Sequence, residues 1–264
     1  MQDFLFAATT VSYLLATLAY TVLWWRGKAA DGKRAMAVLC AAFVLHLSHS
    51  VLLTYRPATA MSGIQLSLSF SALLLVLAYL LAAARMGLHV LGLFVTPLTL
   101  LFFLAAAVPH AGAQMQGAAF SVLLPVHIGL NVFGVVALAL AFTVALVYVI
   151  QEGLLRRKHI GGLFQRLPPL DVLDALGLKL VTAGFGLLTL GIASGTLWLL
   201  RTALPRLRAN QALALIAWAV LAALLLLRFV AGWRGRRAAI GTIFAFVCAL
   251  AVLVGYVLRA QGEA

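Results

Sequence analysis

The sequence predicts an all-α protein that crosses a membrane about eight times. Hydrophobic residues make up 65% of the 264-residue chain and charged residues only 9%, which leaves more apolar surface than a soluble core could bury. The apolar residues fall into eight runs, each long enough for the roughly 17–25 residues that a helix needs to cross a bilayer. We therefore expect one transmembrane helix bundle over residues 1–264 that uses the lipid bilayer as its solvent.

The eight runs are separated by charged residues or by clusters of glycine and proline. We expect the helices at residues 4–25, 35–55, 67–84, 88–108, 119–150, 175–200, 211–231 and 239–258. The first run is too long for the hydrophobic region of a signal peptide, and no basic residue precedes it. It is therefore expected to be a retained helix.

Basic residues are distributed unevenly among the connections between these runs. The odd-numbered connections hold twelve Lys and Arg residues, whereas the even-numbered connections and the C-terminal tail hold five. Because cytoplasmic loops are enriched in Lys and Arg, we expect the odd connections in the cytoplasm and both termini outside. The net charge of +13 follows from this placement and from contact with anionic lipid, so it does not indicate nucleic-acid binding.

Histidines within the apolar runs are the first candidates for a functional site, since ionisable side chains are rare inside membranes. His46 and His49 are about one helical turn apart and share a face of their helix. The expected topology places this pair and His127 at similar depth near the outer surface. Two imidazoles facing each other across a bundle can hold a haem iron from both sides. The alternative is hydrogen bonding across helices or contact with a wet crevice, and spacing alone favours it.

Other polar side chains are weaker candidates. Asn131 lies one turn beyond His127 on the same face, where it can orient the imidazole, contact a haem propionate or hydrogen-bond to another helix. His89, His110 and His159 lie at or between the ends of apolar runs, and each is more typical of a loop residue than of a ligand.

Several kinds of active site are absent from the sequence. No phosphate-binding loop, nucleophile elbow, HExxH motif or pair of catalytic carboxylates occurs, so nothing indicates an enzyme. Cys40 and Cys248 lie inside apolar runs without metal-binding spacing and are expected to be buried small hydrophobic residues. The six acidic residues are assigned to the N-terminus, the loops and the tail, which leaves no chain of intramembrane carboxylates for a proton pump.

Small residues are concentrated in the run 175–200. Gly191 and Gly195 form a small-xxx-small pattern, which lets neighbouring helix backbones approach closely, so this face is expected to pack against another helix. The preceding segment 165–176 (QRLPPLDVLDAL) contains two prolines and two carboxylates among leucines. It is expected to be an amphipathic interfacial entry to the sixth helix.

Five segments in fixed order resemble the cytochrome c assembly family, and within it the HemX-type and YpjD-type inner-membrane proteins. They are 126–130 (VHIGL), 167–170 (LPPL), 182–198 (TAGFGLLTLGIASGTLW), 217–218 (AW) and 232–237 (GWRGRR). The resemblance covers about residues 120–258. It implies an eight-helix haem-handling protein of the bacterial inner membrane, with His127 at the position of a haem-ligand histidine.

The sequence also departs from that family. Members that present haem to apocytochromes carry a tryptophan-rich WWD segment in the loop matched here by residues 201–211, which read RTALPRLRANQ. Two further family histidines are replaced, one by Leu227 and one within the segment 255–259 (GYVLR). The resemblance therefore implies an accessory protein rather than a complete haem-delivery platform.

We interpret the sequence as that of a haem-binding or haem-handling inner-membrane accessory protein that works with another membrane protein. His127 is the expected ligand on one side of the haem, and His46 or His49 on the other, with His46 favoured because it lies deeper. One alternative is a small-molecule or ion transporter or channel, which would need a polar path. Another is a regulatory membrane protein that binds a partner through the small-residue face of the run 175–200.

Overall fold

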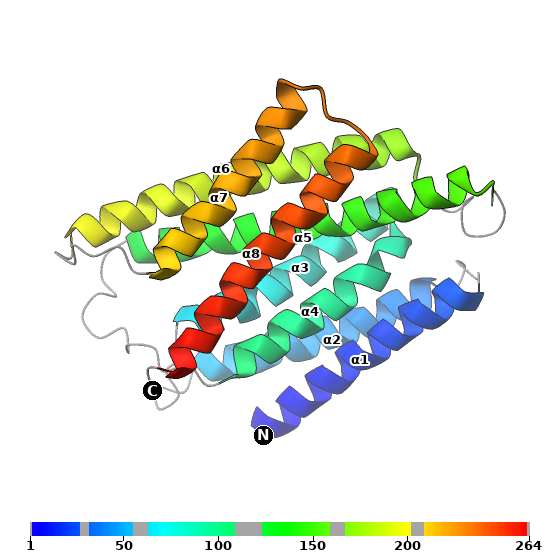
Figure 1. The fold of residues 1–264 in the computed structure, drawn as a ribbon. Helices are drawn as coiled ribbons and strands as arrows, with labels where there is room; N and C mark the ends of the chain where they lie inside the picture. Colours follow the sequence, from blue (N-terminus) through cyan, green and yellow to red (C-terminus); the bar gives the residue numbers. More distant parts are fainter. Residues whose placement is uncertain are drawn as a thin grey trace.

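The structure is a computed structural model that describes residues 2–26, 32–54, 63–108, 123–158, 167–201 and 209–262. In these ranges every regular element is helical, and eight long helices and one short 3₁₀ helix form a single bundle (Figure 1). The elements are α1 (Gln2–Arg26), α2 (Gly32–Thr54), α3 (Gly63–Met86), η2 (His89–Leu91), α4 (Gly92–Ala107), α5 (Leu123–Arg156), α6 (Leu170–Arg201), α7 (Ala209–Phe229) and α8 (Arg236–Gly262). The prediction of an all-α bundle of eight helices is confirmed.

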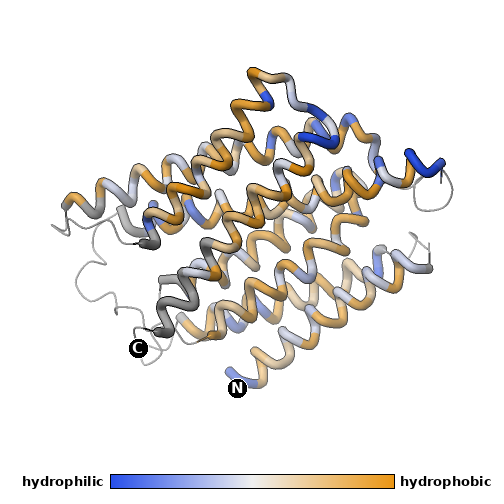
Figure 2. The backbone as a smooth tube through the Cα atoms, viewed as in Figure 1, coloured by the Kyte–Doolittle hydropathy of each residue, from blue (hydrophilic) through white to orange (hydrophobic). Residues whose placement is uncertain are grey.

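Most of these helices have the length and composition of membrane spans. Over the described residues, α1 to α7 supply seven segments that are long and apolar enough to cross a bilayer. Figure 2 shows hydrophobic residues along the middle of the helices and hydrophilic residues mainly at their ends. Large apolar side chains such as Leu18, Leu190 and Leu226 are more than half exposed, as expected where lipid is the solvent. The chain is therefore a multi-pass membrane protein.

The last helix, α8, runs antiparallel to α7 and packs against both α5 and α7. It begins with Arg236 and Arg237 and continues for 27 residues, a length sufficient to cross the bundle. Figure 1 shows that the end of α8 and the start of α1 lie at the same end of the molecule. This arrangement matches an even number of crossings.

Two helices extend beyond their predicted bounds. α5 continues to Arg156, six residues past the expected end, and in its last turn Arg156 bonds to Glu152 at 2.8 Å. α6 begins at Leu170, directly after two prolines whose missing backbone N–H groups suit a helix start. The predicted interfacial entry is therefore, from Leu170 onward, the first part of α6, and residues 165 and 166 lie outside the described ranges.

The helices divide into two neighbouring groups. In the first, α1 packs against α2 and α4, and α3 packs against α4 and α2. In the second, α5 pairs with α6 over most of its length, and the α7–α8 hairpin covers this pair mainly through α8. Contacts between α3 and α5 join the two groups.

Glycines bring α5 and α6 into close contact. A Cβ atom added to Gly134 would lie 2.9 Å from the Leu188 side chain, and one added to Gly184 would lie 2.9 Å from the Leu138 side chain. Real Cβ atoms do not approach other atoms so closely, so neither position has room for a larger residue. The close packing predicted from the glycines of the sixth helix is present, and its partner is α5.

Candidate functional site

His127 lies near the start of α5 with its imidazole against α6. Its Nδ1 atom is 2.7 Å from the carbonyl oxygen of Gly191. A carbonyl only accepts hydrogen bonds, so Nδ1 carries the hydrogen and donates it. The lone pair of the neutral ring is then on Nε2, which is the form in which an imidazole binds a metal ion.

Asn131 holds the His127 ring from within the same helix. Its Nδ2 atom donates a 2.7 Å hydrogen bond to the His127 carbonyl oxygen and lies 3.2 Å from Nδ1 and 3.4 Å from Nε2 of the ring. These nearly equal distances place the amide across one face of the imidazole, because an in-plane position would collide with the carbon between the two nitrogens. The sequence placed Asn131 on this shared face, and the structure shows that it restricts the ring.

Two glycines of α6 make room for these side chains. A Cβ atom at Gly195 would lie 2.6 Å from Cε1 of His127, and one at Gly191 would lie 2.9 Å from Nδ2 of Asn131. Ser194 of α6 also lies beside the imidazole. Its hydroxyl donates to the Gly191 carbonyl at 2.9 Å and lies 3.5 Å from Nδ1 of His127. The small-xxx-small pattern and the candidate histidine, which the sequence presented as separate features, thus belong to one site.

His46 is enclosed in the first helix group. Its side chain is fully buried, Nδ1 lies 3.0 Å from the Tyr13 hydroxyl of α1, and Nε2 lies 3.0 Å from the Ser69 hydroxyl of α3. The ring of Phe103 packs against it with 4.5 Å between centroids. Both ring nitrogens of His46 therefore have partners. In the structure His46 makes hydrogen bonds across helices, which was the alternative to haem binding.

His49 differs from its neighbour on the same helix face. It is half-buried, and its Nδ1 atom is buried without a hydrogen-bond partner. The rings of Phe6 and Phe103 each lie with their centroids 6.0 Å from that of the His49 ring. Of the His46/His49 pair, His49 is therefore the residue with an unengaged ring nitrogen.

The candidate histidines occupy separate helix groups. Across the described ranges, no hydrogen bond or ring contact joins His127 to His46 or His49. His89 lies in η2 against the start of α2, since a Cβ atom added to Gly32 would lie 3.3 Å from Cβ of His89. His110 and His159, the loop candidates, lie outside the described residues.

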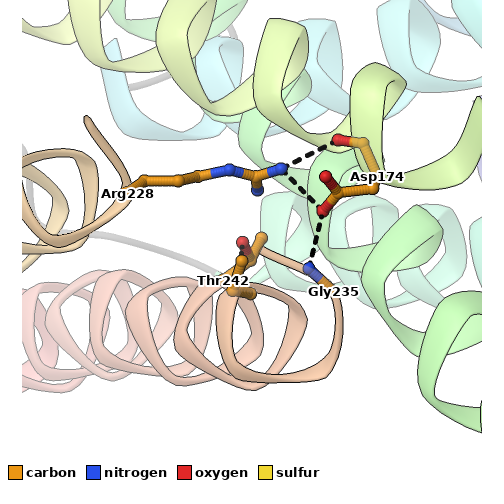
Figure 3. Close-up of polar contacts among 5 residues, drawn as sticks. Asp174, Arg228, Gly235 and Thr242 are labelled. Atoms are coloured by element: carbon orange, nitrogen blue, oxygen red, sulfur yellow. Dashed lines mark hydrogen bonds and ion pairs between the residues drawn. The ribbon is translucent and has the colours of Figure 1, made fainter. Parts of the chain in front are cut away.

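A partly buried ion pair is a polar site that the sequence did not predict. Arg228 of α7 donates from Nη2 to Oδ1 of Asp174 at 2.7 Å and to the Asp174 carbonyl oxygen at 3.0 Å (Figure 3). The backbone N–H of Gly235 donates to the same Oδ1 atom at 3.2 Å. The assignment of acidic residues to loops was wrong for Glu152, which lies in α5, and for Asp171 and Asp174, which lie in the first turns of α6. An arginine inside an apolar run was the signal that could have predicted a buried carboxylate partner.

A family model described as "Cytochrome C assembly protein" matches residues 61–259. The matched region contains His127, Asn131 and the Asp174–Arg228 pair, whereas His46 and His49 precede it. The helices α3 to α7 lie fully within it.

Curated relatives of this chain are named as cytochrome c biogenesis proteins. A cytochrome c biogenesis protein CcsA of Gloeothece citriformis is 36% identical over 115 residues, which cover 37% of this chain and 32% of that relative. Proteins of the same name from Rippkaea orientalis and Prochlorococcus marinus are 37% and 38% identical over similar stretches, each covering 31% of the relative and 37% and 35% of this chain. The chain thus spans about a third of the length of the curated relatives it matches. No solved structure matches the chain.

The family model covers well over half of the chain and includes the His127 site together with the helices that build it. The protein therefore belongs to the cytochrome c assembly family.

Proposed function

We propose that this protein binds haem beside His127 and acts as an accessory membrane protein in cytochrome c biogenesis. Family membership and the names of the relatives support the process. The single observation that supports haem binding at His127 is the 2.7 Å hydrogen bond between Nδ1 of His127 and the Gly191 carbonyl. This bond fixes the tautomer in which Nε2 is available to an iron ion.

The chemistry of this site fits haem. No group of three or more His, Cys, Asp or Glu residues in the described ranges could hold a bare metal ion. Haem needs fewer protein ligands, since the porphyrin supplies four nitrogens and one or two axial ligands come from the protein. A histidine held by Asn131 and by a backbone carbonyl supplies such a ligand with a defined ring orientation.

For the opposite side of the haem we propose His49 in place of the originally favoured His46. Nδ1 of His49 has no partner, whereas binding through His46 would break a hydrogen bond to Tyr13 or Ser69 inside a closed core. His46 and His49 both lie on α2, outside the region that matches the family. The two helix groups would have to enclose the haem between them for His49 and His127 to share it.

The accessory role is proposed because the chain lacks the WWD segment. The loop that carries the WWD segment in haem-presenting members has neither tryptophan nor aspartate here, so a haem-presenting partner protein in the same membrane is part of the proposal. We propose the plasma membrane of a bacterium as the location, with His127 near the outer surface. No catalytic step is assigned to the chain itself.

Haem titration of the purified protein tests this proposal. The apoprotein in detergent is mixed with haemin, reduced with dithionite, and followed by the Soret absorbance. We expect binding by the wild type and a sharp loss of the Soret band in His127→Ala, because no other side chain on α5 replaces the imidazole. His110→Ala is the control and is expected to bind normally, because the sequence predicts His110 between two apolar runs, and an iron ligand needs a rigid element to hold it.

Two results would contradict the proposal at different levels. Normal haem retention by His127→Ala would reject the ligand while leaving haem binding intact. A wild-type protein that does not bind haem at all would reject the function and favour a transporter or a regulatory membrane protein.

A further inference from the structure

The first helix group contains buried polar atoms that the protein leaves without partners. The hydroxyls of Thr9 and Thr99 and the Nδ1 atom of His49 are buried and make no hydrogen bond. Both threonines are 0% exposed. They lie on α1 and α4, and His49 lies on α2.

Other threonines in the same helices do not share this property. Thr10, Thr17 and Thr96 each donate to the carbonyl oxygen four residues earlier, at 2.8–2.9 Å. This bond is the usual way for a hydroxyl to be satisfied inside a membrane helix. Thr9 and Thr99 lack it, so their buried hydroxyls are not satisfied by their own helix backbone.

The three unpaired atoms belong to one region around Phe103. Phe6 and Tyr13 of α1 contact the Phe103 ring at 5.1 and 5.9 Å between centroids, and Thr9 lies between them on the same helix face. Thr99 is one turn before Phe103 on α4. The His49 ring lies 6.0 Å from the Phe103 ring.

A series of hydrogen bonds between side chains begins at Tyr13, in the same region. The Tyr13 hydroxyl bonds to His46, His46 bonds to Ser69, and the Ser69 hydroxyl lies 3.4 Å from that of Ser50. Ser50 is partly exposed and lies in the last turns of α2. Polar groups therefore extend from the end of α2 to the buried atoms near Phe103.

We propose that the α1–α2–α4 interface holds ordered water between Thr9, Thr99 and His49. A buried hydroxyl or imidazole nitrogen without a partner is costly, and a water molecule that finds two to four polar partners removes this cost. Water is also the ligand whose size and chemistry suit isolated hydroxyls among tightly packed aromatic rings. The water site belongs to the haem-free protein, because iron bound to Nδ1 of His49 would take the place of the water at that atom.

Hydroxyl-radical footprinting by X-ray radiolysis of water tests this site in the haem-free protein in lipid nanodiscs. Radicals form from water next to a side chain, so a buried aromatic ring is modified only where internal water lies beside it. Phe103 and its neighbour Phe102 are matched probes, since they are 2% and 1% exposed. We expect rapid modification of Phe103 and none above background at Phe102.

Isosteric variants identify the groups that hold the water. Thr9→Val and Thr99→Val remove a hydroxyl without changing side-chain volume, and each is expected to lower Phe103 modification toward the level of Phe102. Thr96→Val is the control, because its hydroxyl bonds to the Gly92 carbonyl and is not part of the site. This variant should leave Phe103 modification unchanged.

Two outcomes would overturn the proposal. If Phe103 in the wild type is as unreactive as Phe102, the interface is dry and the threonine hydroxyls turn to their own helix carbonyls. If Phe103 is modified equally in the wild type and both Thr→Val variants, the water lies elsewhere.

Discussion

Arg228 of α7 and Asp174 of α6 form an ion pair of 2.7 Å, and the oxygen that accepts it also accepts the backbone N–H of Gly235. Their side chains are 5% and 25% exposed. One carboxylate therefore ties together α6, α7 and the turn that leads into α8.

Replacing one partner of this pair should destabilise the protein. Arg228→Met leaves the Asp174 carboxylate without its cation, and breaking a buried pair costs about 3–5 kcal/mol. Because Asp174 is partly exposed, we expect a loss near the lower end of this range. Thermal unfolding in detergent measures it, and the double variant Arg228→Met/Asp174→Asn should be more stable than Arg228→Met alone.

The pair between Arg156 and Glu152 is the matched control. It joins residues one turn apart on α5, and the Arg156 side chain is 65% exposed. The Glu152 side chain is 14% exposed, and Arg236 lies 3.8 Å from its other carboxylate oxygen. Pairs with an exposed partner contribute only about 0–1 kcal/mol, and Arg236 remains beside Glu152, so Arg156→Met should change stability little. Equal losses in Arg156→Met and Arg228→Met would show that the burial of the arginine does not distinguish the two pairs.

Adding a methyl group at Gly195 should disturb the His127 site. Its Cβ would lie 2.6 Å from the imidazole, and overpacking of this kind costs about 1–3 kcal/mol. We expect Gly195→Ala to lower both thermal stability and haem affinity. Gly186→Ala on the same helix has open space around the new Cβ, so it should be neutral or stabilising. Similar behaviour of the two variants would contradict the close α5–α6 contact.

The two histidines of α2 should respond differently to substitution. His46→Ala leaves the Tyr13 hydroxyl unpaired in the core and leaves Ser69 with only its 3.4 Å contact to Ser50, and an unsatisfied group costs about 1–3 kcal/mol. Its main effect should be on thermal unfolding. His49→Ala removes a ring with no hydrogen bond at Nδ1, so it should retain most stability and lose Soret absorbance. The reverse pattern would restore His46 as the preferred ligand.

Topology is open to a direct measurement. The basic segments at the end of α5 and in the α7–α8 turn lie opposite the end of the bundle where α1 begins (Figure 2). The positive-inside rule then places both termini outside. A C-terminal alkaline phosphatase fusion, active only outside the cytoplasm, should be active. A green fluorescent protein fusion that folds in the cytoplasm and fluoresces would invert this topology.

The fold was predictable because the membrane imposes it. Twenty or so apolar residues between charged connections leave helices as the regular backbone structure, so their number and order followed from the sequence. The bounds were less predictable, since α5 continues through Glu152 and Arg156 beyond the apolar run. Hydropathy detects the hydrocarbon layer and not the helix turns that extend past it.

The candidate site was predictable only in part. Helical periodicity placed Asn131 beside His127, and the glycine pattern predicted close packing of the sixth helix. That Gly191 and Gly195 face these two residues depends on the antiparallel register of α5 and α6, which neither local pattern contains. The same limit applies to Asp174 and Arg228, since they are 54 residues apart in the chain. The assignment to HemX-type or YpjD-type proteins stays a prediction.

The glycine contact between α5 and α6 also constrains how the protein can move. Side chains occupy the space at Gly134, Gly184, Gly191 and Gly195, so sliding or rotation of one helix against the other would create collisions between residues 127–138 of α5 and 184–195 of α6. Interfaces of this kind behave as rigid units. For the haem binding proposed at His127, this rigidity means that the α5–α6 pair would stay fixed while neighbouring helices move to admit the haem.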